Sequence, residues 1–168
     1  IAVIPARAGS KRLPKKNYIP FNSRTLVEIA RDKCLAAGIF DKVIISSDDP
    51  FFEELVSCNE VEFLKRTEDL AGDDATTDMV VDFFFQQFPA CESLLWVNSV
   101  SPLQSIEDIK TCGVRLNDPN IDCVMAVNTL YQHCCISNKP LNFNPNNPFE
   151  KTQDLEPIQR YIYSLSLI

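Results

Sequence analysis

The chain has 168 residues and a formal net charge of -7 at pH 7, with 45% hydrophobic and 23% charged residues. These values fit one ordinary globular domain with a substantial core, and the acidic balance argues against nucleic acid or an anionic membrane surface as a partner. No apolar stretch reaches the ~18 residues of a bilayer-spanning helix, and no secretory signal is present, so we expect cytoplasmic localisation, bacterial above all, or nuclear localisation in an animal.

Short apolar runs recur along the chain, and segments with helical periodicity separate them. The runs cover residues 1–4, 43–45, 61–64, 94–97 and 124–127. Continuous apolar strands that alternate with helices are typical of a parallel sheet covered on both faces. We therefore predict an α/β fold, a three-layer α/β/α Rossmann-like domain with a mainly parallel sheet.

Helix signals fall between these runs. The clearest helix begins after Thr25, because Thr25 and Glu28 have the spacing of a capping box, and Gly38 can end it. Further helices are predicted after residues 49–50, over about 76–88, and from Ser105.

Residues 138–148 contain five Asn and three Pro, which predicts turns or a loop in place of a regular element. We expect one domain over residues 1–168 with a loop excursion at about 128–160. The sequence lacks an initial Met and ends within an apolar run, so we expect it to continue beyond residue 168.

A cluster of positive charge directly follows the first predicted strand, and no acidic residue occurs before Glu28. Its members are Arg7, Lys11, Arg12, Lys15 and Lys16. Loops at the carboxyl ends of parallel strands are where α/β sheets bind ligands, and cations there can neutralise an oligophosphate. Gly9 and Ser10 add backbone and hydroxyl donors. The motifs GxxxxGK[ST] and GxGxxG are both absent, and a solvated basic loop without a ligand remains an alternative.

The string PARAGSKRLPKKN, residues 5–17, resembles the N-terminal signature of the nonulosonate cytidylyltransferases, which make CMP-sialic acid and its bacterial relatives. The CMP-Kdo synthetases are more distant members of the same group. Residues 40–49, 61–82 and 101–109 fit the same family in order and spacing. The resemblance implies a nucleotidyltransferase domain that transfers CMP from CTP to a 2-keto-3-deoxy sugar acid and releases pyrophosphate. It also implies Mg²⁺ as cofactor and a homodimer.

The resemblance assigns roles to individual residues. The catalytic and phosphate-binding positions are Arg7 and Lys16, and the triphosphate cradle would be completed by Ser10, Lys11, Arg12 and Asn17. Cytosine would be read by Arg66, Asp74 and Thr77, with Asn98 as a further amide and Arg160 facing the sugar carboxylate or a phosphate. The residues offer plainer alternatives: Asp74, Thr76 and Thr77 are ordinary helix caps, and Arg160 is an ordinary surface side chain.

The sequence departs from the family at residues 96–104, which read WVNSVSPLQ. Where the family usually has LQPTSPLR, Asn98 replaces a Gln and Gln104 replaces an Arg. The family's metal-binding carboxylates lie mostly in a C-terminal segment that nothing here matches, so we expect the Mg²⁺ ligands outside this sequence. Two alternatives stay open: a degenerate, non-catalytic nucleotide-binding or scaffold domain, and a nucleotidyltransferase for another sugar or base.

Overall fold

The computed structural model describes residues 1–11, 13–115 and 118–167, with side chains up to residue 161. The chain divides into two compact units, Ile1–Val124 with Ser164–Ile168, and Met125–Tyr163. Among the described residues, no helix has the length and apolar character needed to cross a membrane.

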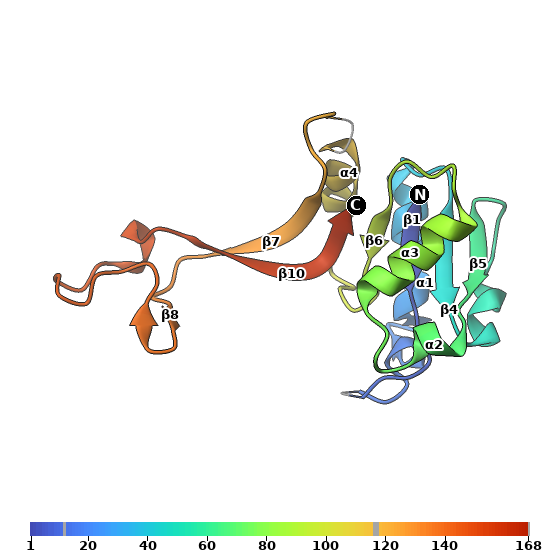
Figure 1. Cartoon of the computed structure of the whole chain (residues 1–168), viewed down its shortest axis with the longest axis horizontal. Helices are drawn as coiled ribbons and strands as arrows, with labels where there is room; N and C mark the ends of the chain where they lie inside the picture. The colour runs from blue at the N-terminus through green and yellow to red at the C-terminus, as the bar shows by residue number, and fades with distance from the viewer. Residues whose placement is uncertain (12, 116–117, 168) are drawn as a thin grey trace. The chain divides into compact units, whose positions relative to one another are not determined.

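A parallel sheet forms the centre of the first unit (Figure 1). Its strands lie in the order β5-β4-β1-β6, and all three pairings are parallel. Their bounds are β1 (Ala2–Pro5), β4 (Val43–Ser47), β5 (Val61–Lys65) and β6 (Leu95–Val97). The end of β10 (Ile158–Leu167) pairs with β6 in the antiparallel direction. The predicted mainly parallel sheet is therefore confirmed.

Helices cover both faces of this sheet. On one face α1 (Leu26–Ala37) packs on β1 and β4 and against α4 (Ile106–Arg115). On the other face lies α3 (Thr77–Gln87), which passes in front of β1 and β4 in Figure 1. This division follows from the alternation of side chains along buried strands, and it confirms the predicted three layers.

Phe84 anchors α3 to the sheet. It is 1% exposed and belongs to a buried cluster with Val3, Ile44 and Leu94. Val3 and Ile44 are neighbours across β1 and β4, so a single aromatic ring covers the middle of the sheet.

The predicted capping signals operate as expected. The backbone N–H of Thr25 donates to Glu28 Oε2 at 2.6 Å, and the N–H of Glu28 donates to Thr25 Oγ1 at 3.2 Å. Gly38 ends α1 in the left-handed conformation with φ 65°. The helix predicted after residues 49–50 is a 3₁₀ helix, η2 (Pro50–Leu55), which begins at Pro50 and is capped by the Asp49 carboxylate.

The second unit contains most of β7 (Val124–Leu130) and β10, a short 3₁₀ turn η3 (Thr152–Asp154) and a small hairpin. The hairpin pairs β8 (Cys135–Ile136) with β9 (Lys139–Pro140). Both residues of its turn, Ser137 and Asn138, have positive φ, which matches the right-handed twist of a two-residue hairpin. The prediction of an irregular segment over 138–148 is therefore wrong at Lys139–Pro140 and holds for the remainder.

Replacing Phe84 with Ala should lower the free energy of unfolding by about 3–5 kcal/mol, because it removes a buried ring from a packed cluster. Urea denaturation followed by circular dichroism measures the change. Met79→Ala, on the same helix at a side chain that is 44% exposed, is the control and should cost less than about 1 kcal/mol. Equal losses in the two variants would contradict the packing of α3 described above.

Candidate functional site

A cavity of about 260 Å³ lies at the carboxyl ends of β1, β5 and β6. This is the edge at which open α/β sheets bind ligands. We call it the site pocket, and it is lined by Pro5, Arg7, Lys16, Asn17, Arg66, Leu70, Gly72, Asp73, Ala75, Thr76, Thr77, Val80, Trp96, Asn98 and Ser99.

The site pocket brings together most of the predicted contacts. Six of them line it: Arg7, Lys16, Asn17, Arg66, Thr77 and Asn98. Ser10, Lys11 and Asp74 do not line it, although Lys11 forms an ion pair with the lining residue Asp73. Arg160 is exposed on β10 in the second unit, and Arg12 lies outside the described residues.

The loop after β1 is anchored to the carboxyl end of β4. The Asp48 carboxylate accepts a hydrogen bond from the backbone N–H of Ala8 at 2.8 Å. Ser47 Oγ donates to the carbonyl of Ala6 at 2.7 Å, and the Tyr18 hydroxyl donates to Asp49 at 2.5 Å. Burial, together with the hydrogen bond to Asp49, raises the pKa of Tyr18. These contacts fix both ends of a loop whose own cations repel one another.

Immediately beyond the anchored loop, the chain turns back into a two-residue hairpin that leads to α1. It pairs β2 (Pro20–Phe21) with β3 (Arg24–Thr25). Asn22 and Ser23 form its turn, both with positive φ. The loop is thus bounded by regular structure on both sides.

Asn17 ties this loop to the segment after β6. It lies in the 3₁₀ turn η1 (Lys16–Tyr18) and is 5% exposed. Its Nδ2 donates to the carbonyl of Arg7 at 2.9 Å, and its Oδ1 accepts from Ser99 Oγ at 3.1 Å. Because both ends of the amide are engaged inside the protein, Asn17 positions the pocket wall. Ser99, where the family usually has Pro, is a site residue that the sequence prediction missed.

Arg66 is a buried guanidinium with donor capacity to spare. It is 6% exposed, and its Nε donates to Ser46 Oγ at 2.9 Å. Its Nη2 is buried and meets no acceptor within the described residues. Burial lowers the pKa of Arg66 to about 10, opposed by the charge of Asp48 and assisted by that of Arg7. An unpaired buried donor is costly, so this group is poised for an acceptor on a bound ligand.

Arg7 joins the loop after β1 to the segment after α2 (Glu68–Ala71). Its Nη1 donates to the carbonyls of Gly72 at 3.0 Å and Ala71 at 3.4 Å. It also contacts the Asp73 carboxylate at 3.5 Å, while Lys11 Nζ lies 2.9 Å from the other oxygen of Asp73. The sequence prediction chose Asp74 in this segment, but Asp73 is the acid in the pocket wall.

The amino end of α3 forms another wall. Thr76 caps this helix by accepting a hydrogen bond from the N–H of Met79 at 3.2 Å, so the capping alternative applies to Thr76. Thr77, the first helical residue, lines the pocket beside it. The free N–H groups of a helix start favour an electronegative ligand atom.

Residues 102–104, which follow the pocket wall after β6, are held outside the pocket lining. Gln104 Nε2 donates to Asp108 at 2.7 Å, and Lys33 Nζ donates to the carbonyls of Pro102 and Gln104, the latter at 2.6 Å. Burial lowers the pKa of Lys33, and the charge of Arg24 adds to this effect. Gln104 thus pairs with a side chain in the first turn of α4, which Ser105 caps through the N–H of Asp108, and it does not line the site pocket.

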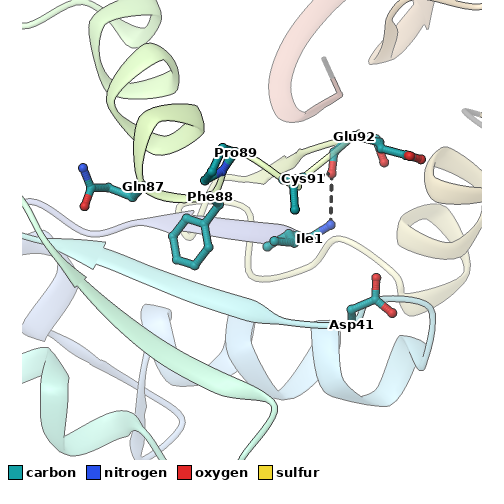
Figure 2. A pocket seen from close by; sticks show the side chains of 9 residues that line it. Ile1, Asp41, Gln87, Phe88, Pro89, Cys91 and Glu92 are labelled. Carbon is teal, nitrogen blue, oxygen red and sulfur yellow. Dashed lines mark hydrogen bonds between the residues drawn. The ribbon is translucent and has the colours of Figure 1, made fainter.

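A second cavity of about 530 Å³ lies beside Ile1, beyond the carboxyl end of α3 (Figure 2). Figure 2 shows Ile1 below Cys91, with its amino group hydrogen bonded to the carbonyl of Ser93. The side chains that line it include the acids Asp41 and Glu92 but no Lys or Arg. Although it is larger, this cavity therefore lacks the cations that a polyphosphate requires.

Metal ligands are scarce around the site pocket. Within the part of the chain that the structure describes, no group of three or more His, Cys, Asp or Glu side chains is arranged to hold a metal ion. Mg²⁺ is usually held by one or two carboxylates together with substrate phosphates, and among the residues that line the site pocket Asp73 carries such a carboxylate.

Solved structures support the fold. The chain is similar to CMP:2-keto-3-deoxy-manno-octonic acid synthetase complexed with CTP, with a TM-score of 0.65 and 17% identity over 99% of this chain and 72% of that one. It is also similar to 4-diphosphocytidyl-2C-methyl-D-erythritol synthase from Anaerococcus prevotii, with a TM-score of 0.66 and 15% identity over 99% of this chain and 68% of that one.

Curated proteins of similar sequence are named as cytidylyltransferases. An N-acylneuraminate cytidylyltransferase of Streptococcus agalactiae serotype V is 27% identical over 79% of this chain and 33% of its own length. A pseudaminic acid cytidylyltransferase of Campylobacter jejuni serotype O:2 is 46% identical over 33% of this chain and 23% of its own. A 3-deoxy-manno-octulosonate cytidylyltransferase of Synechococcus elongatus is 32% identical over 61% of this chain and 40% of its own length. The chain spans about a third of the length of the N-acylneuraminate cytidylyltransferases that it matches.

The family model described as Cytidylyltransferase matches residues 1–158, which is nearly the whole chain. That match covers the anchored loop after β1, the segment around Asp73 and the wall after β6. The chain therefore belongs to the cytidylyltransferase family.

Proposed function

We propose that this chain forms the nucleotide-binding part of an enzyme that transfers CMP from CTP to a nonulosonic, sialic-type sugar acid and releases pyrophosphate. The observation that carries the proposal is the site pocket, which Arg7, Lys16 and Arg66 all line at one edge of the sheet, with the buried Nη2 of Arg66 meeting no acceptor within the described residues. The names of the sequence relatives support the nonulosonic acid as acceptor.

The arrangement suits the chemistry of the transfer. When the sugar hydroxyl attacks the α-phosphate of CTP, negative charge develops on the departing pyrophosphate. Arg7 and Lys16 stabilise that charge from fixed positions, because the hydrogen bonds of Ala8 and Tyr18 hold the loop before the nucleotide arrives. Because these cations are already in position, the reaction does not have to rearrange them. They therefore lower the activation barrier of the transfer substantially.

We assign recognition of the cytosine base to Arg66 and to the start of α3. Arg66 Nη2 donates to a carbonyl or ring nitrogen of cytosine, and the start of α3 offers further N–H donors near Thr77. A buried donor that is satisfied only by the correct base discriminates strongly, since a base without an acceptor there leaves it unpaired.

The metal requirement is a separate part of the proposal. The family resemblance implies Mg²⁺, but the described residues do not supply a carboxylate cluster for it. We assign no step to the metal and infer that any protein ligands come from another part of the full protein.

A second candidate is a domain that binds the nucleotide without turnover. The observation that favours it is Gln104, which replaces a family Arg and is engaged with Asp108, so it supplies no cation to the ligand.

The full-length protein with Mg²⁺ should release pyrophosphate from CTP when a nonulosonic acid is present, and should not do so with ATP or GTP. A coupled pyrophosphate assay with a panel of such acids measures it. Binding of CTP without release by any acid would support the non-catalytic candidate. Equal release from all nucleotides would remove cytosine recognition from the proposal.

Lys16→Ala should weaken CTP binding about 10- to 100-fold, because a charged contact to phosphate contributes about 1.5–3 kcal/mol. Isothermal titration calorimetry measures the affinity. Lys65→Ala, which removes an exposed cation that does not line the pocket, is the control and should change affinity less than about twofold. Unchanged affinity in Lys16→Ala would favour the solvated-loop alternative for the cations.

We also propose a homodimer formed through the second unit. This unit exposes several large apolar side chains, which favours burial against another copy: Tyr131, Ile136, Leu141, Phe149 and Tyr161. Phe149 is 85% exposed although it stacks on His133 with a ring separation of 4.2 Å.

Light scattering after size exclusion should therefore give twice the mass of one chain for the full-length protein. The double variant Ile136→Asp with Leu141→Asp should shift the mass towards that of one chain, because buried carboxylates without partners are costly. Glu150→Gln in the same unit is the control and should leave the mass unchanged. A monomeric wild type would contradict the dimer.

A further inference from the structure

Two cations of the loop after β1, Lys11 and Arg7, already hold an anion of the protein itself. Asp73 Oδ2 lies 2.9 Å from Lys11 Nζ, and Asp73 Oδ1 lies 3.5 Å from Arg7 Nη1. Asp73 also lines the site pocket. The Asp73 carboxylate therefore occupies the region of positive potential that these two cations create.

This contact can be exchanged. The side chains of Asp73 and Lys11 are 51% and 72% exposed, and ion pairs in such surroundings contribute little to stability. Arg7 does not depend on Asp73 for its position, because it also donates to the carbonyls of Gly72 and Ala71. The carboxylate can leave without releasing Arg7 from the pocket wall.

Displacement is a competition between charges. The hydrogen bond from Lys11 lowers the pKa of the Asp73 carboxyl, with further contributions from the charges of Lys11 and Arg7, so Asp73 is ionised at neutral pH. A chain of two or three phosphates brings several negative charges to the same cations and outcompetes one carboxylate. A single phosphate carries a charge of about −1.5 to −2 at pH 7 and meets the same competition from Asp73.

We propose that Asp73 is a competing carboxylate that must be displaced from Lys11 and Arg7 when the nucleotide binds, and that it thereby lowers the affinity of the loop for the phosphates of the ligand. This inference rests on the proposed function, since it assumes that these cations meet the phosphates of the substrate. It gives Asp73 a role in setting the affinity of the site for its ligand.

The test uses the full-length protein and inorganic tripolyphosphate, which engages the cations without a base. Asp73→Asn keeps the size of the side chain and removes its charge, and it should tighten tripolyphosphate binding about two- to tenfold at low salt. Asp73→Ser serves as a second variant. Asp69→Asn removes an equal charge from an exposed residue of α2 outside the pocket lining, and it should change the affinity less than about twofold. Calorimetry measures all four proteins.

Inorganic phosphate tests whether the competition applies to any phosphate ligand. It meets the same carboxylate, so it should also bind more tightly to Asp73→Asn than to wild type. Unchanged or weaker tripolyphosphate binding in both Asp73 variants, or an equal gain in Asp69→Asn, would overturn the competition while leaving the proposed function intact if wild type still binds CTP. Failure of wild type and variants alike to bind either CTP or tripolyphosphate would overturn both.

Discussion

The site depends on the attachment of a positively charged loop to the neighbouring strand. Without an anchor, cations clustered in a short segment would separate into solvent. Asp48 and Asp49, at the carboxyl end of β4, hold that loop through the N–H of Ala8 and the hydroxyl of Tyr18. The anchor exists because β1 and β4 are parallel neighbours, so the two strands end at the same edge. The topology of the sheet thus determines where positive potential can be concentrated.

Two arginines at this edge of the sheet lie in different surroundings. Arg7 is partly exposed and already engaged with backbone carbonyls, which suits contacts to diffuse phosphate charge. Arg66 is almost fully buried, and desolvation makes its remaining donor selective for geometry. Under the proposed function, affinity and specificity would therefore come from side chains in different environments, although both are arginines.

Much of the architecture follows from local signals that the sequence carries openly. The Thr25 and Glu28 capping box, the Gly38 terminus and the apolar strands are decided by residues close in the chain, and the structure confirms them. The hairpin at Lys139–Pro140 was missed because its turn residues, Ser137 and Asn138, must both adopt positive φ, which composition alone does not indicate.

Site residues are harder to predict from the sequence than the fold. Asp73 and Asp74 are the same type of residue, and only the path of the chain after α2 puts Asp73 beside Lys11. Ser99 could not be found by matching the family, since it stands where the family has another residue.

The unsatisfied nitrogen of Arg66 has a consequence for the lifetime of the protein. A ligand that supplies the missing acceptor stabilises the native state and so lowers the fraction of molecules that open locally. Degradation by proteases that act on opened molecules would then slow as the ligand accumulates and quicken when it is scarce. The abundance of the protein would in this way follow the supply of its own ligand.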